Sequence, residues 1–309
     1  MKLSVVICTY NRADMLLDSL TSWQETNASV EPMELIVVDN ASTDSTAQVV
    51  SRFDEARYVL EPQQGLSHAR NRGIAEAKGE LIAFVDDDIF FDKAWPTEIC
   101  RAFDEYPQAD CVGGQSQLHF ESTQPEWLST AAMPFYGSTE SGHAAREMRY
   151  PEHPFGVNMA FRRHIFDEVG MFDPRLGRIK ESLLSNEEKE FFYRVKQNEN
   201  TVIYWPDAKV RHRITEERTS RKWVLSRAYW QGISGAVFEQ MTNRPSRSTL
   251  VLAALQATRT ALHSQKQLFK LLFAAAGSNR EQEKVNQQIQ FRHQLGTLKQ
   301  NLASIFSVP

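Results

Sequence analysis

Three consecutive aspartates, Asp86, Asp87 and Asp88, stand at the end of an apolar run over residues 81–85 that is typical of a buried strand. On an extended segment, side chains two positions apart point the same way, so Asp86 and Asp88 can face one site. Two carboxylates side by side repel each other unless a cation lies between them. Because Mg²⁺ and Mn²⁺ prefer oxygen ligands and in turn bind phosphates, these residues predict a divalent metal beside a phosphate-bearing substrate. The alternative interpretation is a solvated acidic loop.

Other polar side chains also follow directly on short apolar runs. Thr9 comes after residues 3–8, and Asp39 comes after residues 34–38. Fully apolar strands that alternate with helical patterns indicate a parallel sheet covered on both faces. Ligands of such sheets bind beyond the carboxyl ends of the strands. We therefore expect Thr9, Asp39 and Asp86 to converge at one edge of the sheet.

Glu187 and Glu188 begin a segment with helical spacing and are candidates for a carboxylate that accepts a proton. Apolar residues follow Glu188 three, four and seven positions later, so Glu188 is expected at the head of the buried stripe of this helix. Partial burial there would raise the pKa of Glu188 and make it a stronger base. The alternative interpretation is that both glutamates only favour a helix N-terminus.

The composition is that of an ordinary globular protein, with 41% hydrophobic and 24% charged residues. Its 309 residues suffice for one large α/β domain with an appendage or for two modest domains. Three widely spaced cysteines without a CxxC pair argue against a disulfide framework and fit a reducing cytosol. The apolar run at the N-terminus is too short for a signal peptide, and no stretch approaches the ~20 apolar residues of a spanning helix. These features predict a cytoplasmic protein.

Over residues 1 to about 235 the chain resembles the glycosyltransferase family 2 enzymes of GT-A fold. The matching motifs, in order, cover residues 4–12, 37–44, 65–73, 86–88, 156–163 and 187–188, followed by His212. The resemblance implies an α/β fold with a mostly parallel sheet flanked by helices. It also implies metal-dependent, inverting transfer of a sugar from a nucleoside-diphosphate donor to a hydroxyl acceptor.

The resemblance assigns roles to individual residues on the donor side. The residues implied to bind the nucleotide or donor are Thr9, Tyr10, Asn11, Arg12, Asp39, Arg70, Asp86 and Asp87. Among them, Asp39 would hold the base and Asp86 would lie near the ribose and the metal. Asp88 would ligate Mn²⁺ or Mg²⁺, and His212 would complete the metal shell. The alternative for His212 is a surface imidazole in a basic patch.

On the acceptor side, Glu188 matches the second member of a carboxylate pair whose second residue is the base, and Glu187 matches the first. Inverting transfer is a single displacement, so one carboxylate must take the proton of the acceptor hydroxyl. A glutamate replaces the commoner aspartate here, which leaves the identity of the acceptor open. Gly156 and Asn158 fall where the acceptor-side loop of the family lies, although Asn158 could equally be a turn residue.

The resemblance predicts a catalytic domain over residues 1–221, with a nucleotide-binding half over about 1–110 and an acceptor half over about 111–221. A helical C-terminal extension would cover residues 222–309. The expected donor is a nucleoside-diphosphate sugar, with UDP-sugars favoured, and the expected acceptor is a saccharide or a lipid-linked saccharide of polysaccharide or cell-envelope biosynthesis. No nucleic-acid partner is expected. The alternatives are a nucleotidyltransferase, against which the glycine-free loop after the first strand argues, and a non-catalytic nucleotide-sugar-binding module.

Charge is unevenly distributed along the chain. Residues 208–309 carry 16 Lys and Arg against 5 Asp and Glu, whereas residues 1–207 carry 19 against 34. The basic part contains helical segments with apolar faces, and such a segment can lie on an anionic membrane surface near a lipid-linked acceptor. The protein would then be peripheral at the inner face of the cell membrane. The alternatives are a homodimer through these helices, packing on the catalytic domain, and a solvated basic face.

Overall fold

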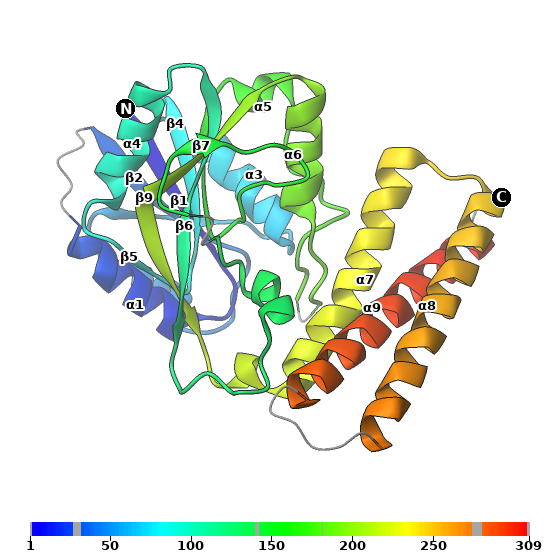
Figure 1. Ribbon diagram of the computed structural model, residues 1–309. Helices are drawn as coiled ribbons and strands as arrows, with labels where there is room; N and C mark the ends of the chain where they lie inside the picture. Colours follow the sequence, from blue (N-terminus) through cyan, green and yellow to red (C-terminus); the bar gives the residue numbers. More distant parts are fainter. Residues whose placement is uncertain (1, 27–31, 140–141, 181, 274–279, 308–309) are drawn as a thin grey trace. The chain divides into compact units, whose positions relative to one another are not determined.

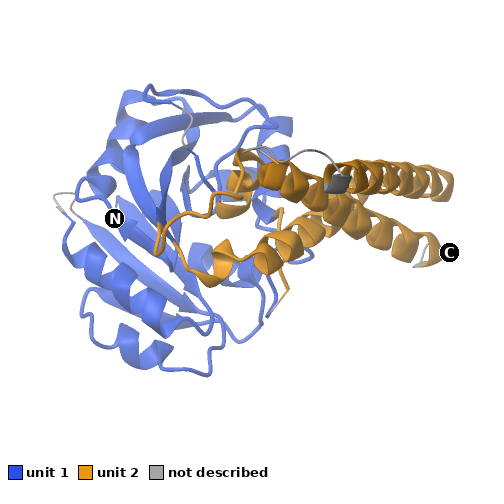
Figure 2. Cartoon of the chain, turned by 60° about the horizontal axis from the view of Figure 1, so that its bottom comes forward, with its two compact units in different colours: residues 1–119, 137–180, 187–213 blue, residues 120–136, 181–186, 214–309 orange. Residues whose placement is uncertain are grey.

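The computed structural model describes residues 2–26, 32–139, 142–180, 182–273 and 280–307. The chain forms two compact units, which Figure 2 distinguishes by colour. Unit 1 comprises residues 1–119, 137–180 and 187–213, and unit 2 comprises residues 120–136, 181–186 and 214–309. The expected catalytic domain over 1–221 and helical extension over 222–309 stay predictions, because compactness alone does not assign function.

One half of the sheet in unit 1 is parallel (Figure 1). Its strands, in spatial order, are β3 (Ala56–Leu60), β2 (Met33–Asp39), β1 (Leu3–Thr9) and β4 (Leu81–Asp86). In the register of β1 with its two neighbours, Thr9 lies opposite Asp39 and Cys8 lies opposite Asp86. The carboxyl ends of the three strands therefore meet at one edge of the sheet.

The other half of the sheet is antiparallel. Strand β8 (Asn158–Arg162) pairs with β4 and with β6 (Ala109–Phe120), and β9 (Thr201–Ile214) lies between β6 and β5 (Ile89–Phe91). The short β7 (Arg146–Glu147) also pairs with β9. The predicted α/β fold, with a sheet flanked by helices, is confirmed, but the sheet is mixed rather than mostly parallel, because β5, β6, β7, β8 and β9 pair antiparallel. The antiparallel strands lie in the part of the chain after β4, where the sequence pattern is less regular.

Helices cover both faces of the sheet in unit 1. They are α1 (Ala13–Gln24), α2 (Thr46–Val50), α3 (Leu66–Glu76), α4 (Trp95–Glu105), α5 (Ile165–Glu168) and α6 (Glu187–Gln197). Successive side chains of β1 point to opposite faces: Val5 and Ile7 join the core formed with α1 and α4, whereas Val6 joins the core formed with α3 and α6. Because both faces are buried, the strand needs a continuous apolar run.

Unit 2 consists mainly of long helices. They are α7 (Arg221–Asn243), α8 (Arg247–Phe273) and α9 (Arg280–Ser307), accompanied by the short 3₁₀ segments η1 (Thr130–Tyr136) and η2 (Glu217–Thr219). Helix α9 packs against both α7 and α8. A Cβ added to Gly232 of α7 would lie 1.9 Å from the carbonyl oxygen of His293, and one added to Gly296 of α9 would lie 1.9 Å from that of Tyr229. The backbones of α7 and α9 are therefore in direct contact, which only glycine permits. None of the helices among the described residues is both long and apolar enough to span a bilayer.

Candidate active site

The loops that follow β1 and β2 are tied together by side-chain hydrogen bonds. Asn11, which has a φ of +51°, accepts the Thr43 N–H at Oδ1 (2.7 Å) and donates its own N–H to Ser42 Oγ (2.9 Å). The N–H of Ala13, at the start of α1, donates to the Asp44 carboxylate (2.9 Å). The predicted donor-binding motif over residues 9–12 and the segment after Asp39 are thus joined by hydrogen bonds at the carboxyl ends of β1 and β2.

Asp39 is buried and already has hydrogen-bond donors on both oxygens. The Ser42 N–H donates to Oδ1 and the Tyr58 hydroxyl donates to Oδ2, each at 2.8 Å. Partial burial and this hydrogen bond to Asp39 raise the pKa of Tyr58 to about 12, so the hydroxyl keeps its proton. A nucleobase held by Asp39 would share these oxygens. Tyr10, on the neighbouring loop, is half-buried.

Asp86, Asp88 and His212 offer ligand atoms that all lie within 4.8 Å of one another. Asp88 Oδ1 is 3.2 Å from His212 Nε2, and both side chains are buried. Strand pairing brings them together, because His212 of β9 lies opposite Ile89 of β5 and the Arg213 N–H donates to the Asp88 carbonyl oxygen (2.8 Å). Two carboxylates and one imidazole suit a divalent ion such as Mn²⁺, so the residues fit the metal expected there.

Arg12 and Thr9 hold the middle of the aspartate run. The Arg12 guanidinium contacts Asp87 Oδ1 (2.5 Å) and Asp88 Oδ2 (2.6 Å), and Thr9 Oγ1 donates to Asp87 Oδ2 (2.7 Å). Burial raises the pKa of Asp87 to about 6 even though Arg12 acts against it. Asp87 is therefore a fixed link between the ends of β1 and β4, while Asp86 and Asp88 face His212.

Arg70 is the centre of a second group of charges. It is buried, and its Nη1 and Nη2 lie 2.9 Å from Glu187 Oε1 and 3.4 Å from Glu188 Oε1. The Gly156 N–H also donates to Glu188 Oε1 (3.1 Å). Since Asn158 pairs with Val85 of β4, Gly156 lies beside the end of that strand, next to the aspartate run. The structure thus brings Arg70, Gly156 and both glutamates together near the edge that carries Asp86.

The pKa predicted for Glu188 is wrong in direction. Its burial by itself would raise the pKa, but the Arg70 charge and a backbone hydrogen bond outweigh burial and lower the pKa of Glu188. Glu187 is the residue that heads the buried stripe, since its side chain is 3% exposed against 17% for Glu188. Burial and the neighbouring charge of Glu188 raise the pKa of Glu187 to about 7.

The side chain of Asn158 is fully engaged inside the sheet. Its Oδ1 accepts the Trp95 indole N–H (3.0 Å), and its Nδ2 donates to the carbonyl oxygens of Gln115 (3.1 Å) and Ala208 (2.8 Å). These bonds join β8 to α4, β6 and β9. The acceptor-side role of Asn158 stays a prediction, and the structure gives the residue a role in joining strands.

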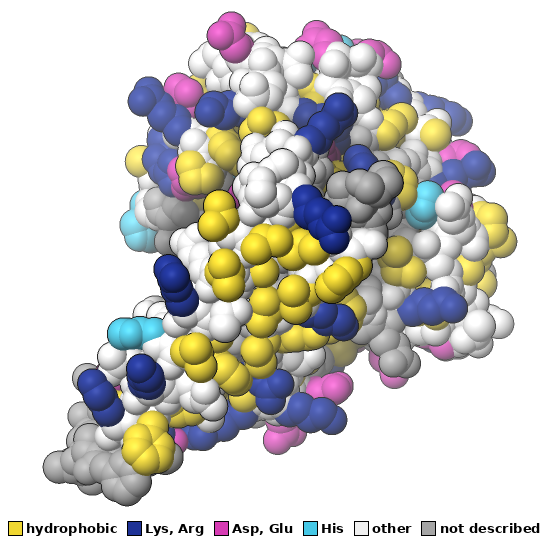
Figure 3. Space-filling view, turned by 90° about the vertical axis from the view of Figure 1, so that its right-hand side faces the viewer, with side chains coloured by type: hydrophobic (Ala, Val, Ile, Leu, Met, Phe, Trp, Pro, Cys, Tyr) yellow, Lys and Arg dark blue, Asp and Glu magenta, His cyan; other side chains and the backbone are white. Residues whose placement is uncertain are grey.

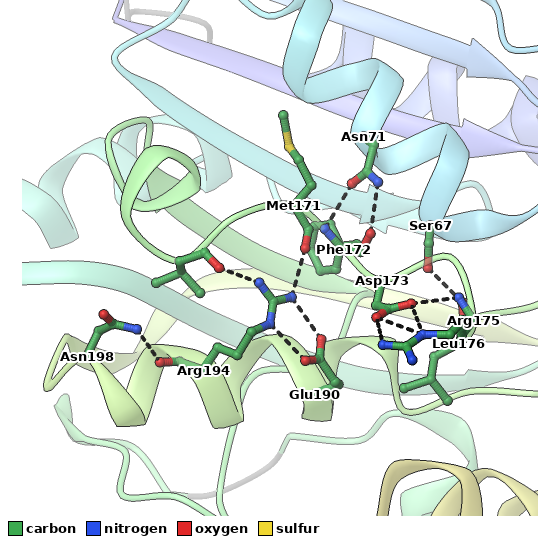
Figure 4. A network of polar contacts seen from close by, with 11 residues as sticks. Ser67, Asn71, Met171, Phe172, Asp173, Arg175, Leu176, Glu190, Arg194 and Asn198 are labelled. Atoms are coloured by element: carbon green, nitrogen blue, oxygen red, sulfur yellow. Dashed lines mark hydrogen bonds and ion pairs between the residues drawn. The ribbon is translucent and has the colours of Figure 1, made fainter. Parts of the chain in front are cut away.

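Figure 4 shows how the loop that follows α5 is fastened to α3 and α6. Asn71 of α3 donates to the Phe172 carbonyl oxygen (2.9 Å) and accepts the Phe172 N–H (3.0 Å). Arg194 of α6 donates to the carbonyl oxygens of Val169 (2.5 Å) and Met171 (2.8 Å). These contacts set the position of the loop relative to both helices.

Three residues near the glutamates are absent from the sequence-based prediction. Phe172 stacks on Phe191 with ring centroids 4.7 Å apart, and it lies 5.4 Å from the Arg70 guanidinium carbon. Asn71 directly follows Arg70 in the 65–73 motif, which was a usable signal. His153 packs against Phe192 of α6 (5.9 Å), and no sequence signal separates it from a surface histidine.

Comparison with known proteins adds a family and a set of similar chains. A model of the family described as glycosyl transferase family 2 matches residues 4–170. The chain is 29% identical over 249 residues to the glucosyl-dolichyl phosphate glucuronosyltransferase of Haloferax volcanii, covering 77% of this chain and 78% of that relative.

Two solved structures share the fold at low sequence identity. The mannosyltransferase PcManGT from Pyrobaculum calidifontis, in complex with GDP-Man and Mn²⁺, has a TM-score of 0.55 at 17% identity, covering 100% of this chain and 76% of that chain. GalNAc-T7 with UDP, GalNAc and Mn²⁺ has a TM-score of 0.52 at 15% identity, covering 76% of this chain and 51% of that chain.

Proposed function

The chain belongs to glycosyl transferase family 2 and is a glycosyltransferase, and from this premise we propose that it transfers a sugar from a nucleoside diphosphate to a hydroxyl group with inversion. The observation that supports this reaction is the pair of charge groups at one sheet edge. One group, Asp86, Asp88 and His212, suits a divalent ion that would in turn bind the diphosphate of a donor. The other contains Glu188, which suits proton transfer from an acceptor.

Asp86, Asp88 and His212 are the residues that would hold Mn²⁺ or Mg²⁺. When bound, such an ion supplies positive charge that stabilises the leaving diphosphate. The complexes of PcManGT and GalNAc-T7 with Mn²⁺ support this assignment by analogy. Arg12 would then keep Asp88 oriented through its contact with Oδ2.

Glu188 is proposed as the base. Because its pKa is lowered, its carboxylate is ionised at neutral pH, and its side chain is the more exposed of the two glutamates. The acceptor hydroxyl would lose its proton to Glu188 as the acceptor oxygen forms a bond to the anomeric carbon. The bond from that carbon to the phosphate oxygen breaks in the same step, and its electron pair leaves with the diphosphate. Glu187 and Arg70 would position Glu188.

The donor is proposed to lie against the residues 9–12, Asp39 and the aspartate run, with UDP-sugars favoured. The acceptor is proposed to be a lipid-linked saccharide, which agrees with the dolichyl phosphate in the name of the Haloferax relative. Residues 1–221 would form the catalytic domain, with donor and acceptor halves over about 1–110 and 111–221. Every residue assigned to the site lies in unit 1, whereas residues 120–136, 181–186 and 214–221 of the proposed catalytic domain belong to unit 2.

The test is Glu188→Gln, which keeps the shape of the side chain and removes its basicity. Turnover, measured as release of nucleoside diphosphate in the presence of Mn²⁺, is expected to fall about 10²- to 10⁴-fold while donor affinity stays within about twofold. The matched control is Glu168→Gln, since this glutamate is half-exposed on α5. It should retain normal turnover. Normal turnover in Glu188→Gln would show that Glu188 is not the base.

A further inference from the structure

Helix α8 differs from the rest of the chain in its charge. Its 27 residues contain Arg247, Arg259, Lys266 and Lys270 but no aspartate or glutamate. The protein as a whole has a net charge of −4. A helix that only needed solubility would not require this exclusion of acidic residues, so its charge points to an anionic partner.

The inner face of α8 carries small side chains. Ala254, Ala257, Ala261 and Ser264 are buried, and Leu250, which packs against Ile305 of α9, is the large residue among them. Small residues let a helix approach its neighbours closely but bury little apolar area. The packing of α8 within unit 2 therefore uses only a small part of the apolar side chains that the helix carries.

Four large apolar side chains of α8 lie on its outer face. Leu252, Leu255, Leu262 and Phe269 are 66%, 52%, 52% and 62% exposed. Their spacings of three and seven residues place them along one line of the helix, which at 1.5 Å per residue is about 26 Å long. Such a line of exposed large apolar residues is typical of a surface that is covered by a partner.

Basic side chains lie along the same line. Arg259 is four residues after Leu255 and Lys266 is four residues after Leu262, and both are exposed. Figure 3 views the side on which α8 lies in Figure 1, and it shows hydrophobic side chains gathered in a band with Lys and Arg around it. This combination of an apolar line with flanking cations matches helices that lie flat in a membrane interface.

We propose that the outer face of α8 binds the surface of an anionic lipid bilayer, with its leucines and Phe269 among the acyl chains and Arg259, Lys266 and Lys270 at the headgroups. A straight, convex line of this length fits a plane better than it fits a groove. A second copy of the chain is a poorer occupant, because like cations of the two α8 helices would be brought together. This inference does not depend on the proposed reaction.

The experiment is flotation of the full chain with vesicles of phosphatidylcholine alone or with about one third phosphatidylglycerol. Binding is expected only to the anionic vesicles and should weaken at high salt, since the charges are screened there. In one variant, Leu255, Leu262 and Phe269 are replaced by serine, and binding should fall at least tenfold.

In the second variant, Arg259, Lys266 and Lys270 are replaced by glutamine. Each charge contributes about fivefold to binding, so a loss of about 100-fold is expected. The matched control replaces three exposed basic residues of unit 1, Arg52, Lys93 and Arg149, by glutamine and should bind as the unchanged chain does. Nucleoside-diphosphate release with a water-soluble acceptor should be equal in all four proteins, which separates a failure of this surface from a failure of the proposed reaction.

Two results would overturn the proposal. The first is a flotation result in which the chain does not bind vesicles, binds both vesicle types equally, or binds no better than the glutamine variant does. The other is a dimer in sedimentation that the serine variant converts to a monomer while vesicle binding is absent, which would make the face an interface between copies. Circular dichroism melting checks that each variant is folded. If the serine variant is not folded, the glutamine variant still tests the proposal, because the three cations that it replaces are exposed.

Discussion

Arg70 is a buried cation whose partners are Glu187, Glu188 and the ring of Phe172. A buried charge is tolerated only when it is paired and hydrogen-bonded, so Arg70 and the two glutamates act as one unit. Gly156 lies against this unit, because an added Cβ would be 2.0 Å from Arg70 Nη2 and 2.5 Å from Glu188 Oε1. Position 156 therefore has no room for a side chain, and only glycine fits there.

Gly156→Ala is expected to displace the Arg70 guanidinium or the Glu188 carboxylate. A shift of about 1 Å at such a group lowers kcat about 10²-fold, whereas donor binding should change little. The measurement is steady-state release of nucleoside diphosphate. Gly235→Ala is the matched control, since an added Cβ there meets nothing within 4 Å. Equal kcat in the two variants would contradict the argument.

Glu187 makes folding depend on pH. Its pKa is raised from 4.5 to about 7, so between these values the folded chain holds a proton that the unfolded chain has lost. Stability therefore falls as pH rises through this window. Glu187→Gln removes the titration. From about pH 5 to about pH 8, the unchanged chain should lose about 1–3 kcal/mol of unfolding free energy relative to this variant. Urea unfolding measures this difference, and parallel pH curves would refute it.

At the scale of elements, the loop after α5 is hydrogen-bonded to two helices. These are α3, which carries Arg70, and α6, which carries Glu187 and Glu188. The fastening of this loop by Asn71 and Arg194 fixes the relative position of the two helices. Asn71 and Arg194 thereby help to set the distance between Arg70 and the two glutamates, although neither residue belongs to the proposed site.

Asn71→Ala removes both hydrogen bonds to the Phe172 backbone. The unfolding free energy should fall by about 1–3 kcal/mol, because two buried backbone groups lose their partner. Asn198→Ala is the control, since that exposed amide donates to the carbonyl oxygen of Arg194, four residues before it. It should change stability by less than about 0.5 kcal/mol. Chemical denaturation of both variants provides the test, and equal losses would show that the loop is not held in this way.

At the scale of the whole molecule, the two units differ in what they offer a ligand. The residues assigned to the donor, the metal and the acceptor all lie in unit 1, whereas the exposed apolar face of α8 lies in unit 2. Binding to the native state stabilises the part that makes the contacts, by about 2.7 kcal/mol at a ligand concentration of one hundred times Kd.

Mn²⁺ together with a nucleoside diphosphate should therefore slow hydrogen exchange in residues 9–12, 39–44 and 86–88. Amides of α8 and α9 should exchange at unchanged rates, and EDTA should reverse the protection. Hydrogen-exchange mass spectrometry resolves these segments. Protection that survives EDTA, or that is equal in α8 and α9, would argue against the metal site at Asp86, Asp88 and His212.

The family and the sheet edge could be predicted because they depend on local patterns. Each buried strand is a short apolar run, and the polar residue that ends it is adjacent in sequence, so the positions of Thr9, Asp39 and Asp86 follow from the chain itself. The glycosyltransferase prediction is confirmed. The nucleotidyltransferase and the non-catalytic module, both open on sequence alone, are not supported by the family.

The parallel half of the sheet, the edge at which we propose that ligands bind, and the residue types at that edge could be predicted from the sequence, because these features depend on neighbours a few positions apart. The folded chain was needed to show that His212 contacts Asp88, that Arg70 contacts both glutamates, and that Glu187 is more deeply buried than Glu188. These pairings depend on the register of β9 with β5 and on the rotation of α6 against the sheet. The register joins segments more than 100 residues apart, and α6 packs both against α3 and against Phe161 and Phe172, so no local pattern encodes either arrangement.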